Sequence, residues 1–300
     1  MANDSTDAAL DGGIGSGNDG VLFSPVNSEN PNFQKYMDTM MTKRSAAEYN
    51  MRHKSRGMAL IFNHKFFAKL ATRNGTDVDC ANLECVLRQL DFRVRVYPDY
   101  KYEQILSAVK EAASLDHTDN DCIMVVILSH GEMGVISAYD MDYSLESIWS
   151  CFTPNNCPSL ANKPKLFFIQ ACRGSELDSG TELKRIETDG DGSIKYKIPT
   201  HADFLTAYST MPGYYSWRNT VKGSWFIQSL CAELEENGKQ LDLLTLLTFV
   251  CQRVAVLFES ATRDPEMHKK KQMPCIASML TRILLFRQRE GSIPTPTRAN

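Results

Sequence analysis

The feature that most constrains the fold is an alternation of short apolar runs with segments of helical spacing. The apolar runs are long enough for strands, and the segments between them repeat apolar residues every three or four positions. Predicted strands lie at 58–63, 93–97, 122–129, 165–171, 203–209 and 276–286, and predicted helices lie at 83–90, 102–113, 145–152, from 224 onward and at 243–258. Strands separated by helices indicate an α/β fold with a mostly parallel sheet that is covered on both faces.

Two segments fall outside this alternation. Residues 1–45 are rich in Gly, Asn, Asp and Ser and show no sustained periodicity, which predicts a disordered N-terminal peptide. Residues 175–197 are dominated by Ser, Asp, Gly and Thr, which predicts an exposed linker. The pieces on either side of this linker are too small to be independent domains, so we expect the linker to interrupt a single domain.

The composition excludes several classes of protein. The net charge is −3 and no long block of Lys or Arg is present, so we expect no nucleic-acid partner. We expect a cytoplasmic protein with no membrane segment, because the chain has neither a signal-peptide pattern nor an apolar run of about 18 residues. The nine cysteines lack paired spacing, which disfavours a disulfide framework and a structural zinc site, and we expect no metal and no cofactor. Most of them, such as Cys85, Cys122 and Cys251, are expected to be small buried side chains.

Two reactive side chains follow predicted buried strands directly. The strand at 122–129 leads into His130 and Gly131, and the strand at 165–171 leads into Cys172 and Gly174. In open parallel sheets the active crevice lies at the carboxyl ends of the strands. A histidine beside a thiol can remove its proton and later protonate a leaving amine. The Gly131 and Cys172 N–H groups are candidates for an oxyanion hole. The other histidines, none of which follows a buried strand into a Gly-rich turn, are interpreted as surface or structural residues.

These residues also carry a resemblance to a known family. The string QACRG at 170–174, with SHGE at 129–132 upstream, resembles the active-site signature of caspases. The likeness extends over about 49–286 and is nearest to insect-type executioner caspases. It implies a three-layer sandwich around a six-stranded sheet, continued across a two-fold dimer through the apolar strand at 276–286. It also implies an executioner of apoptosis that cuts proteins after an exposed aspartate.

The resemblance assigns the substrate-binding residues. In caspases two arginines and a glutamine hold the substrate aspartate, and the matching positions here are Arg73, Gln170 and Arg218. A strip that pairs with the substrate backbone, together with side chains for the neighbouring subsites, matches Tyr215, Ser216, Trp217, Asn219 and Trp225. The loop at 260–268 departs from related executioners, which place aromatic residues there, so the preference upstream of aspartate is open.

The resemblance also implies activation by proteolysis. Asp189 in the linker matches the inter-subunit processing site, which would divide the chain into a large subunit at 46–189 with the nucleophile and a small subunit at 190–300 with Arg218. An upstream initiator caspase would make the cut, and the product would be a dimer of large–small heterodimers. Asp7 is a second candidate processing site, with Asp11 and Asp19 as alternatives. Cleavage at Asp7 would expose Ala8 for binding to inhibitor-of-apoptosis proteins.

Two other interpretations remain at this stage. One is a caspase-like scaffold without catalysis, which is disfavoured because the nucleophile, the histidine and both pocket arginines are present. The other is a redox enzyme or sensor that uses Cys172, which is disfavoured because Cys151 and Cys157 lie before the intervening strand and no resolving cysteine is near.

Overall fold

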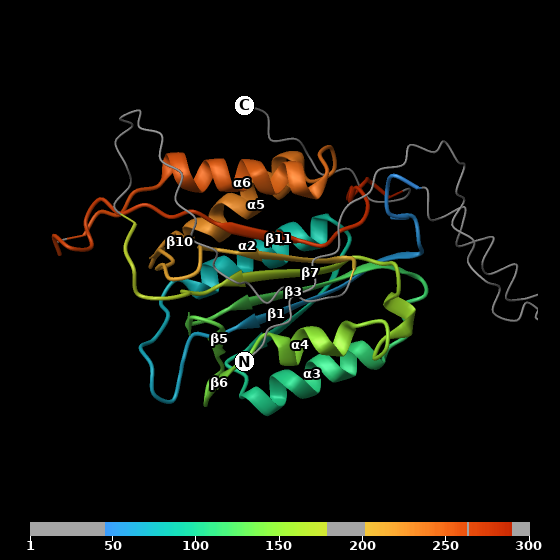
Figure 1. Cartoon of the computed structure of the whole chain (residues 1–300), viewed down its shortest axis with the longest axis horizontal. Coiled ribbons are helices and arrows are strands. Elements are labelled where there is room, and N and C mark those ends of the chain that lie inside the picture. Colours follow the sequence, from blue (N-terminus) through green and yellow to red (C-terminus); the bar gives the residue numbers. More distant parts are fainter. Residues whose placement is uncertain (1–45, 179–201, 263, 290–300) are drawn as a thin grey trace, which may run out of the picture. The chain divides into compact units, whose positions relative to one another are not determined.

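Six strands form the central sheet of the computed structural model, in the order β11-β8-β7-β3-β1-β2 (Figure 1). The structure describes residues 46–178, 202–262 and 264–289, and those from Ala47 onward belong to one compact unit. Five of the strands run parallel to their neighbours, and β11 pairs with β8 in the antiparallel sense. The expected mostly parallel six-stranded sheet is therefore confirmed. The predicted N-terminal peptide at 1–45, with Asp7, lies outside the described residues.

The elements largely follow the expected ranges. The strands of the sheet are β1 (Ser55–Asn63), β2 (Arg93–Pro98), β3 (Asn120–Leu128), β7 (Lys165–Gln170), β8 (Phe204–Tyr208) and β11 (Cys275–Ser278). The helices are α2 (Thr76–Gln89), α3 (Tyr102–Ser114), α4 (Glu146–Trp149), α5 (Trp225–Asn237) and α6 (Leu243–Leu257). Short additional elements are β4 (Gly131–Glu132), β5 (Val135–Ser137), β6 (Asp142–Tyr143), β9 (Arg218–Asn219), β10 (Gly223–Ser224) and two 3-10 turns at Ser150–Phe152 and Pro158–Leu160.

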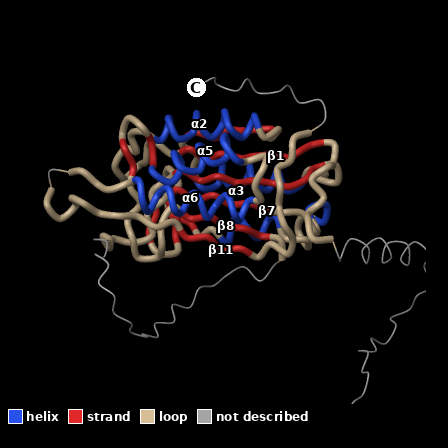
Figure 2. The backbone as a smooth tube through the Cα atoms, turned by 90° about the horizontal axis from the view of Figure 1, so that it is seen from above, coloured by secondary structure: helices blue, strands red, loops and turns tan. Residues whose placement is uncertain are grey.

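Helices cover both faces of the sheet, as Figures 1 and 2 show. Successive side chains of a strand point to opposite faces. Along β1, Ala59 and Ile61 join one hydrophobic cluster, which contains the buried faces of α2, α5 and α6. Leu60 and Phe62 join a second cluster on the other face with α3 and α4. The strands read as continuous apolar runs because both of their faces are buried.

The predicted last strand at 276–286 is wrong in length. β11 ends at Ser278, and the chain then leaves the sheet. Ile283 donates its N–H to Ala47 O at 2.8 Å, and Leu284 O accepts the N–H of Leu243 at the start of α6. Leu284 and Phe286 are apolar because they pack into the core beside the helices. The apolar pattern therefore predicted the burial of Leu284 and Phe286 correctly. It could not predict that Ile283 and Leu284 form their backbone hydrogen bonds outside the central sheet.

Other local predictions also differ from the structure. The helix predicted at 145–152 is one α-helical turn followed by a 3-10 turn. Cys85 is exposed on α2 and Cys251 is half-buried, whereas Cys122 is buried as expected. The small antiparallel sheet β4-β5-β6 was not predicted, because its strands have only two or three residues and carry no periodic signal.

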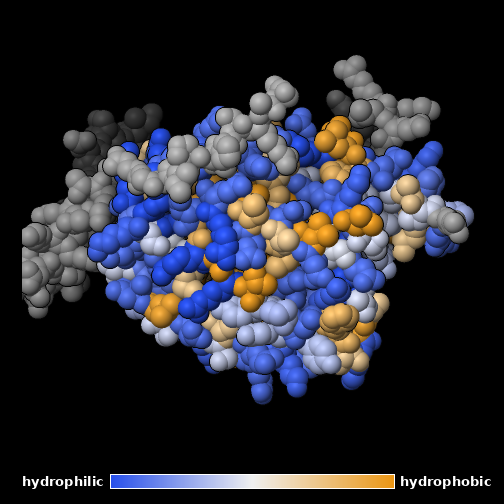
Figure 3. All heavy atoms as spheres, turned by 180° about the vertical axis from the view of Figure 1, so that it is seen from behind, coloured by the Kyte–Doolittle hydropathy of each residue, from blue (hydrophilic) through white to orange (hydrophobic). Residues whose placement is uncertain are grey.

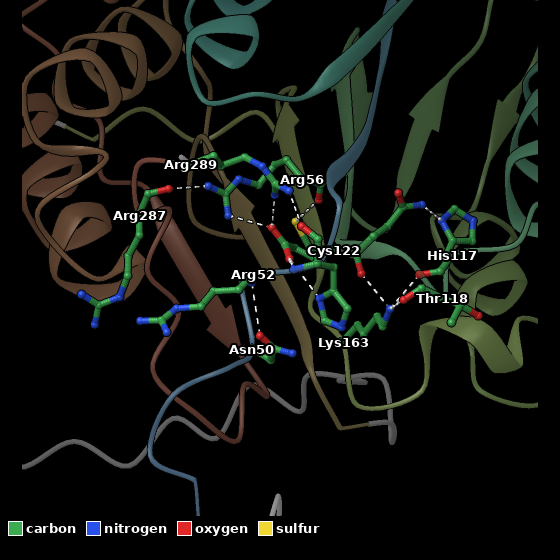
Figure 4. Close-up of polar contacts among 12 residues, drawn as sticks. Asn50, Arg52, Arg56, His117, Thr118, Cys122, Lys163, Arg287 and Arg289 are labelled. Atoms are coloured by element: carbon green, nitrogen blue, oxygen red, sulfur yellow. Dashed lines mark hydrogen bonds and ion pairs between the residues drawn. The ribbon is translucent and has the colours of Figure 1, made fainter. Parts of the chain in front are cut away.

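A buried ion cluster ties the C-terminal segment to the amino ends of β1 and β3. Asp121 is fully buried and pairs with Arg56 at 3.0 Å and with Arg289 at 2.9 Å, and it also accepts from His53. Arg56 and Arg289 both donate to Asp121 Oδ2, and Figure 4 shows these two arginine side chains close together. Arg56 also donates to the backbone oxygen of Arg287. The cluster connects residues on both sides of the predicted linker.

Hydrophobic side chains appear only in small groups on the face shown in Figure 3, among a mostly hydrophilic surface. No helix in the described ranges is long and apolar enough to cross a membrane.

Candidate active site

The candidate site lies at the carboxyl ends of β3 and β7. These strands are parallel neighbours, with Leu128 opposite Gln170, and the next residue, Ser129, donates its N–H to Gln170 O at 3.0 Å. His130 and Cys172 therefore leave adjacent strands at the same end of the sheet. The sequence predicted this arrangement from the two buried strands that precede them.

The Cys172 thiol lies against the strip at 215–219. Ser216 directs its N–H to Cys172 Sγ at 3.4 Å, and the sulfur lies 3.8 Å from Ser216 O. Burial raises the pKa of the thiol, while the Ser216 N–H and then the cations Arg73 and Arg218 act in the opposite direction. The thiol is thus protonated in the unliganded protein at neutral pH.

His130 is held in one orientation by two contacts. Its Nε2 atom lies 2.8 Å from Ala71 O, and its ring centroid lies 4.8 Å from that of Phe67. A carbonyl oxygen only accepts, so this contact assigns the proton to Nε2 and leaves Nδ1 as the basic nitrogen. Burial lowers the pKa of His130, which keeps the imidazole neutral at neutral pH.

The resting site therefore holds a neutral thiol and a neutral imidazole at the same end of the sheet, and this predicts a specific pH dependence of alkylation. Since only the thiolate reacts, the rate of Cys172 modification by iodoacetamide should still be rising above about pH 8.5, the ordinary pKa of a cysteine. Mass spectrometry of the peptide that contains Cys172 separates this reaction from that of the exposed Cys85. A plateau below about pH 7 would instead indicate a thiolate–imidazolium pair.

Gly131 packs tightly against the strand that carries the nucleophile. A Cβ atom at this position would lie 3.1 Å from both Ala171 Cβ and Cys172 O, and 2.8 Å from Val135 O. A side chain would push β4 away from Cys172. This close approach accounts for a glycine here, and the oxyanion hole formed by the Gly131 and Cys172 N–H groups stays a prediction.

Arg73 is fully buried, although the sequence alone favours a surface position for an arginine. Its Nη1 atom donates to His64 O at 3.0 Å and to Thr76 Oγ1 at 2.8 Å. Its Nε and Nη2 atoms are buried and have no hydrogen-bond partner within residues 46–178, 202–262 and 264–289. Buried donors without partners are costly, so this guanidinium is suited to receive an acceptor from outside the described chain.

A second guanidinium is close to the first. Arg218 donates from Nε to Asn74 O at 2.8 Å. Burial and then the nearby Arg218 charge lower the pKa of Arg73 to about 9, so both side chains remain cationic at neutral pH. Gln170, two residues before the nucleophile, is also buried, and its Nε2 donates to Ser216 Oγ at 2.7 Å. The charges of Arg73 and Arg218 both act on the Cys172 thiol, and Gln170 reaches the thiol's neighbour Ser216. A carboxylate bound here would therefore meet two cations.

Hydrogen bonds to the backbone hold the strip at 215–219 along one of its two edges. Trp217 donates its N–H to Gln272 Oε1 at 2.6 Å, and its C=O accepts from Trp225 N at 3.3 Å. Arg218 lies opposite Ser224 in the β9–β10 pair. These contacts leave the backbone groups of Ser216 and Arg218 on the other side of the strip, the side on which Ser216 contacts Cys172, and an extended peptide could add there as a strand.

Aromatic rings line the strip in a row, in which the Tyr215–Trp217 pair is tilted and the two following pairs are stacked. The ring centroids of Tyr215 and Trp217 are 6.4 Å apart, those of Trp217 and Trp225 are 5.7 Å apart, and Trp225 lies 5.4 Å from Phe258. Trp225 is only 7% exposed, so it supports the wall of the site more than it forms its surface. Asn219 accepts from the N–H groups that follow it in the turn between β9 and β10.

Asp79 belongs to the site but was not predicted. This carboxylate is fully buried on α2 and accepts from Ser224 N at 2.7 Å and from the Ser224 hydroxyl. Burial raises its pKa, and the hydrogen bonds from Ser224 and the charges of Arg73 and Arg218 oppose that shift. Asp79 lies four residues before Leu83 and thus on the same face of α2, but the predicted helix began only at 83, so no signal in the sequence pointed to it.

Comparison with known proteins shows the relationship directly. The model of the caspase domain matches residues 56–285. The chain is 63% identical over 281 residues to caspase drICE of Drosophila melanogaster, covering 92% of this chain and 83% of that protein. It is 51% identical to caspase-1 of Spodoptera frugiperda, with 92% and 93% coverage. This chain belongs to the caspase family.

The structural comparison agrees with this result. The crystal structure of caspase-1 from Spodoptera frugiperda superimposes with a TM-score of 0.77, covering 83% of this chain and 97% of that chain at 51% identity. The three-layer caspase fold and the likeness to insect effector caspases are therefore confirmed. The chain is an aspartate-specific cysteine endopeptidase of the effector class, which executes apoptosis.

Proposed function

We propose that Cys172 is the nucleophile of this endopeptidase, that His130 is its acid–base partner, and that Arg73, Gln170 and Arg218 bind the substrate aspartate. The observation that carries this assignment is the pair of buried Arg73 donors without a partner among the described residues. Arg73 is near enough to Arg218 and to Cys172 for their charges to shift its pKa. An aspartate carboxylate accepts two parallel hydrogen bonds and offsets both charges.

The chemistry follows from the positions of these groups. The Nδ1 atom of His130 takes the proton of Cys172, and the sulfur attacks the carbonyl carbon of the substrate aspartate. The oxyanion that forms is stabilised by N–H donors, for which Gly131 and Cys172 are the candidates. His130 then donates its proton to the leaving amine. Water, activated by the same imidazole, cleaves the resulting thioester and releases a new C-terminal aspartate.

Paired peptide reporters test the assignment. A tetrapeptide reporter ending in Asp should be cleaved with a kcat/KM on the order of 10⁴ times that of the same peptide ending in Asn, because the amide offers one acceptor oxygen and no charge to the two arginines. Cys172→Ala should abolish cleavage of both. Equal signals from wild type and Cys172→Ala would overturn the choice of nucleophile, and equal cleavage of the two peptides would overturn the pocket.

We further propose that the enzyme is made as a zymogen that an initiator caspase cuts after Asp189, giving the subunits 46–189 and 190–300. Asp189 lies outside the described residues. The proposal is supported by the order of the site residues along the chain, because Cys172 precedes the linker and Arg218 follows it. A functional site built from both sides can be controlled by the connection between them.

The remaining proposals concern processing, assembly and location. Cleavage after Asp7, or alternatively after Asp11 or Asp19, would remove part of the N-terminal peptide, and a new N-terminal Ala8 would bind inhibitor-of-apoptosis proteins. β11 occupies one edge of the sheet and pairs only with β8 among the described strands, which supports a homodimer of large–small heterodimers. The substrates are proteins with an exposed aspartate, and the proposed location of the enzyme itself is the cytoplasm.

A further inference from the structure

Gln272 occupies an unusual position beneath the substrate strip. Its side chain is 2% exposed and lies between the end of β8 and the strip. Its Oε1 atom accepts the Trp217 N–H at 2.6 Å, and its Nε2 atom donates to Ser209 O at 2.8 Å. Both ends of one buried amide therefore bind backbone, and they connect two segments that are not adjacent in the sheet.

The bond to Trp217 determines which edge of the strip faces the nucleophile. In extended backbone, the N–H and C=O groups of successive residues point to opposite sides. With the Trp217 N–H turned toward Gln272, those of Ser216 and Arg218 turn the other way. The observed contact between Ser216 N and Cys172 Sγ at 3.4 Å agrees with this direction.

Ser209 extends the same network to the nucleophile. Its hydroxyl donates to Ala171 O at 3.0 Å and accepts from Ser216 Oγ at 2.9 Å. Ser216 Oγ in turn accepts from Gln170 Nε2. The buried chain thus joins the residue before Cys172, the pocket glutamine and the strip, and Gln272 anchors it through the Ser209 carbonyl.

We propose that Gln272 is a positioning residue that sets the register of the substrate-binding strip against Cys172. It does not touch substrate, because its side chain is buried and both of its polar ends bind the protein. The proposal rests on the proposed role of the strip. Its consequence is that Gln272 acts on the binding of an extended peptide backbone rather than on the thiol.

Substrates of different length test this role. Wild type should gain in kcat/KM from an acetyl-Asp reporter to an acetyl-tetrapeptide reporter, because only the longer peptide pairs with the strip. In Gln272→Met, which keeps the side-chain length but removes both hydrogen bonds, this gain should fall about tenfold to a hundredfold, mainly through KM. If the substitution only destabilised the protein, kcat/KM would fall by the same factor for the acetyl-Asp and the acetyl-tetrapeptide reporter. The ratio of the two values would then stay as in wild type.

Asn120→Leu is the matched control. Asn120 is 4% exposed, and its side chain also makes two hydrogen bonds, to His117 and from Arg93, at the opposite end of the sheet. Its replacement should lower thermal stability and leave the length dependence as in wild type. The Gln272 proposal is overturned if the two variants behave alike.

Gln272→Glu adds a test of geometry. Burial favours the protonated carboxyl group, which offers one donor and one acceptor like the amide. The tetrapeptide gain in this variant should therefore approach that of wild type as the pH falls from 8 to about 6. A gain that stays low at every pH contradicts the proposal. If instead Cys172→Ala remains active, the proposed nucleophile fails, and this outcome is separate from any result with Gln272.

Discussion

Arg73→Met should lower kcat/KM for a reporter ending in Asp by a factor between about a hundred and several thousand while the protein remains folded. Removing one partner of a buried charge pair costs about 3–5 kcal/mol, and each 1.4 kcal/mol is a factor of ten. Since the lost partner recognises the carboxylate, the preference for Asp over Asn should fall by a similar factor. Steady-state kinetics with both reporters measures this.

The stability of this variant should not fall. In the unliganded protein the Arg73 charge is fully buried, lies near Arg218, and leaves two nitrogens without a partner in the described chain. Such a group destabilises the fold, so an apolar side chain of similar length should keep or raise the melting temperature. If Arg73→Met loses activity while its melting temperature stays the same or rises, Arg73 serves substrate binding and not the fold.

Arg56→Met is the matched control for this experiment. Arg56 is also a fully buried arginine, but it pairs with Asp121 and donates to the backbone at Leu90 and Arg287. Its removal should destabilise the protein by about 3–5 kcal/mol and leave kcat/KM of the folded protein unchanged. If Arg73→Met behaves in the same way as Arg56→Met, Arg73 is structural and the proposed aspartate pocket is wrong.

The contrast between these two arginines shows what the sequence could predict. Strands buried on both faces are continuous apolar runs, and the residues that follow them, His130 and Cys172, could be placed at one end of the sheet without a structure. Arg56 and Arg73 carry no such pattern. The burial of Arg56 depends on partners that lie between 34 and 231 residues away along the chain. Two of the Arg73 nitrogens have no partner in the described chain at all.

The same reasoning explains the residues that were missed. Gln272 bonds to the backbone of Trp217 and of Ser209. Every residue type has these backbone groups, so such contacts cannot be recognised from the sequence. The pocket arginine and the strip were found only because the family resemblance named them. Periodicity predicts which residues are buried, whereas polar contacts between distant segments require the three-dimensional structure.

Asp189→Ala should keep the precursor in a single, weakly active chain after treatment with an active initiator caspase. Wild type should be cut into two fragments and should gain activity, and the variant should remain about a hundredfold less active, as expected for a site that is mostly in its inactive arrangement. Gel electrophoresis and the aspartate reporter follow both events. Asp191→Ala is the matched control, since it alters a second Asp-Gly pair two residues further along.

The described flanks of the linker give a physical reason for this dependence. Glu176 donates its N–H to Gly213 O at 2.8 Å and accepts from Tyr215 N at 3.0 Å, while Asp178 O accepts from Lys271 N at 2.8 Å. The chain that leaves Cys172 is thus hydrogen-bonded to the start of the strip and to the residue before Gln272. A cut at Asp189 releases the far end of this segment, so the strip and the nucleophile can adjust together. Full activity of Asp189→Ala, or cleavage that Asp191→Ala prevents instead, would contradict this coupling.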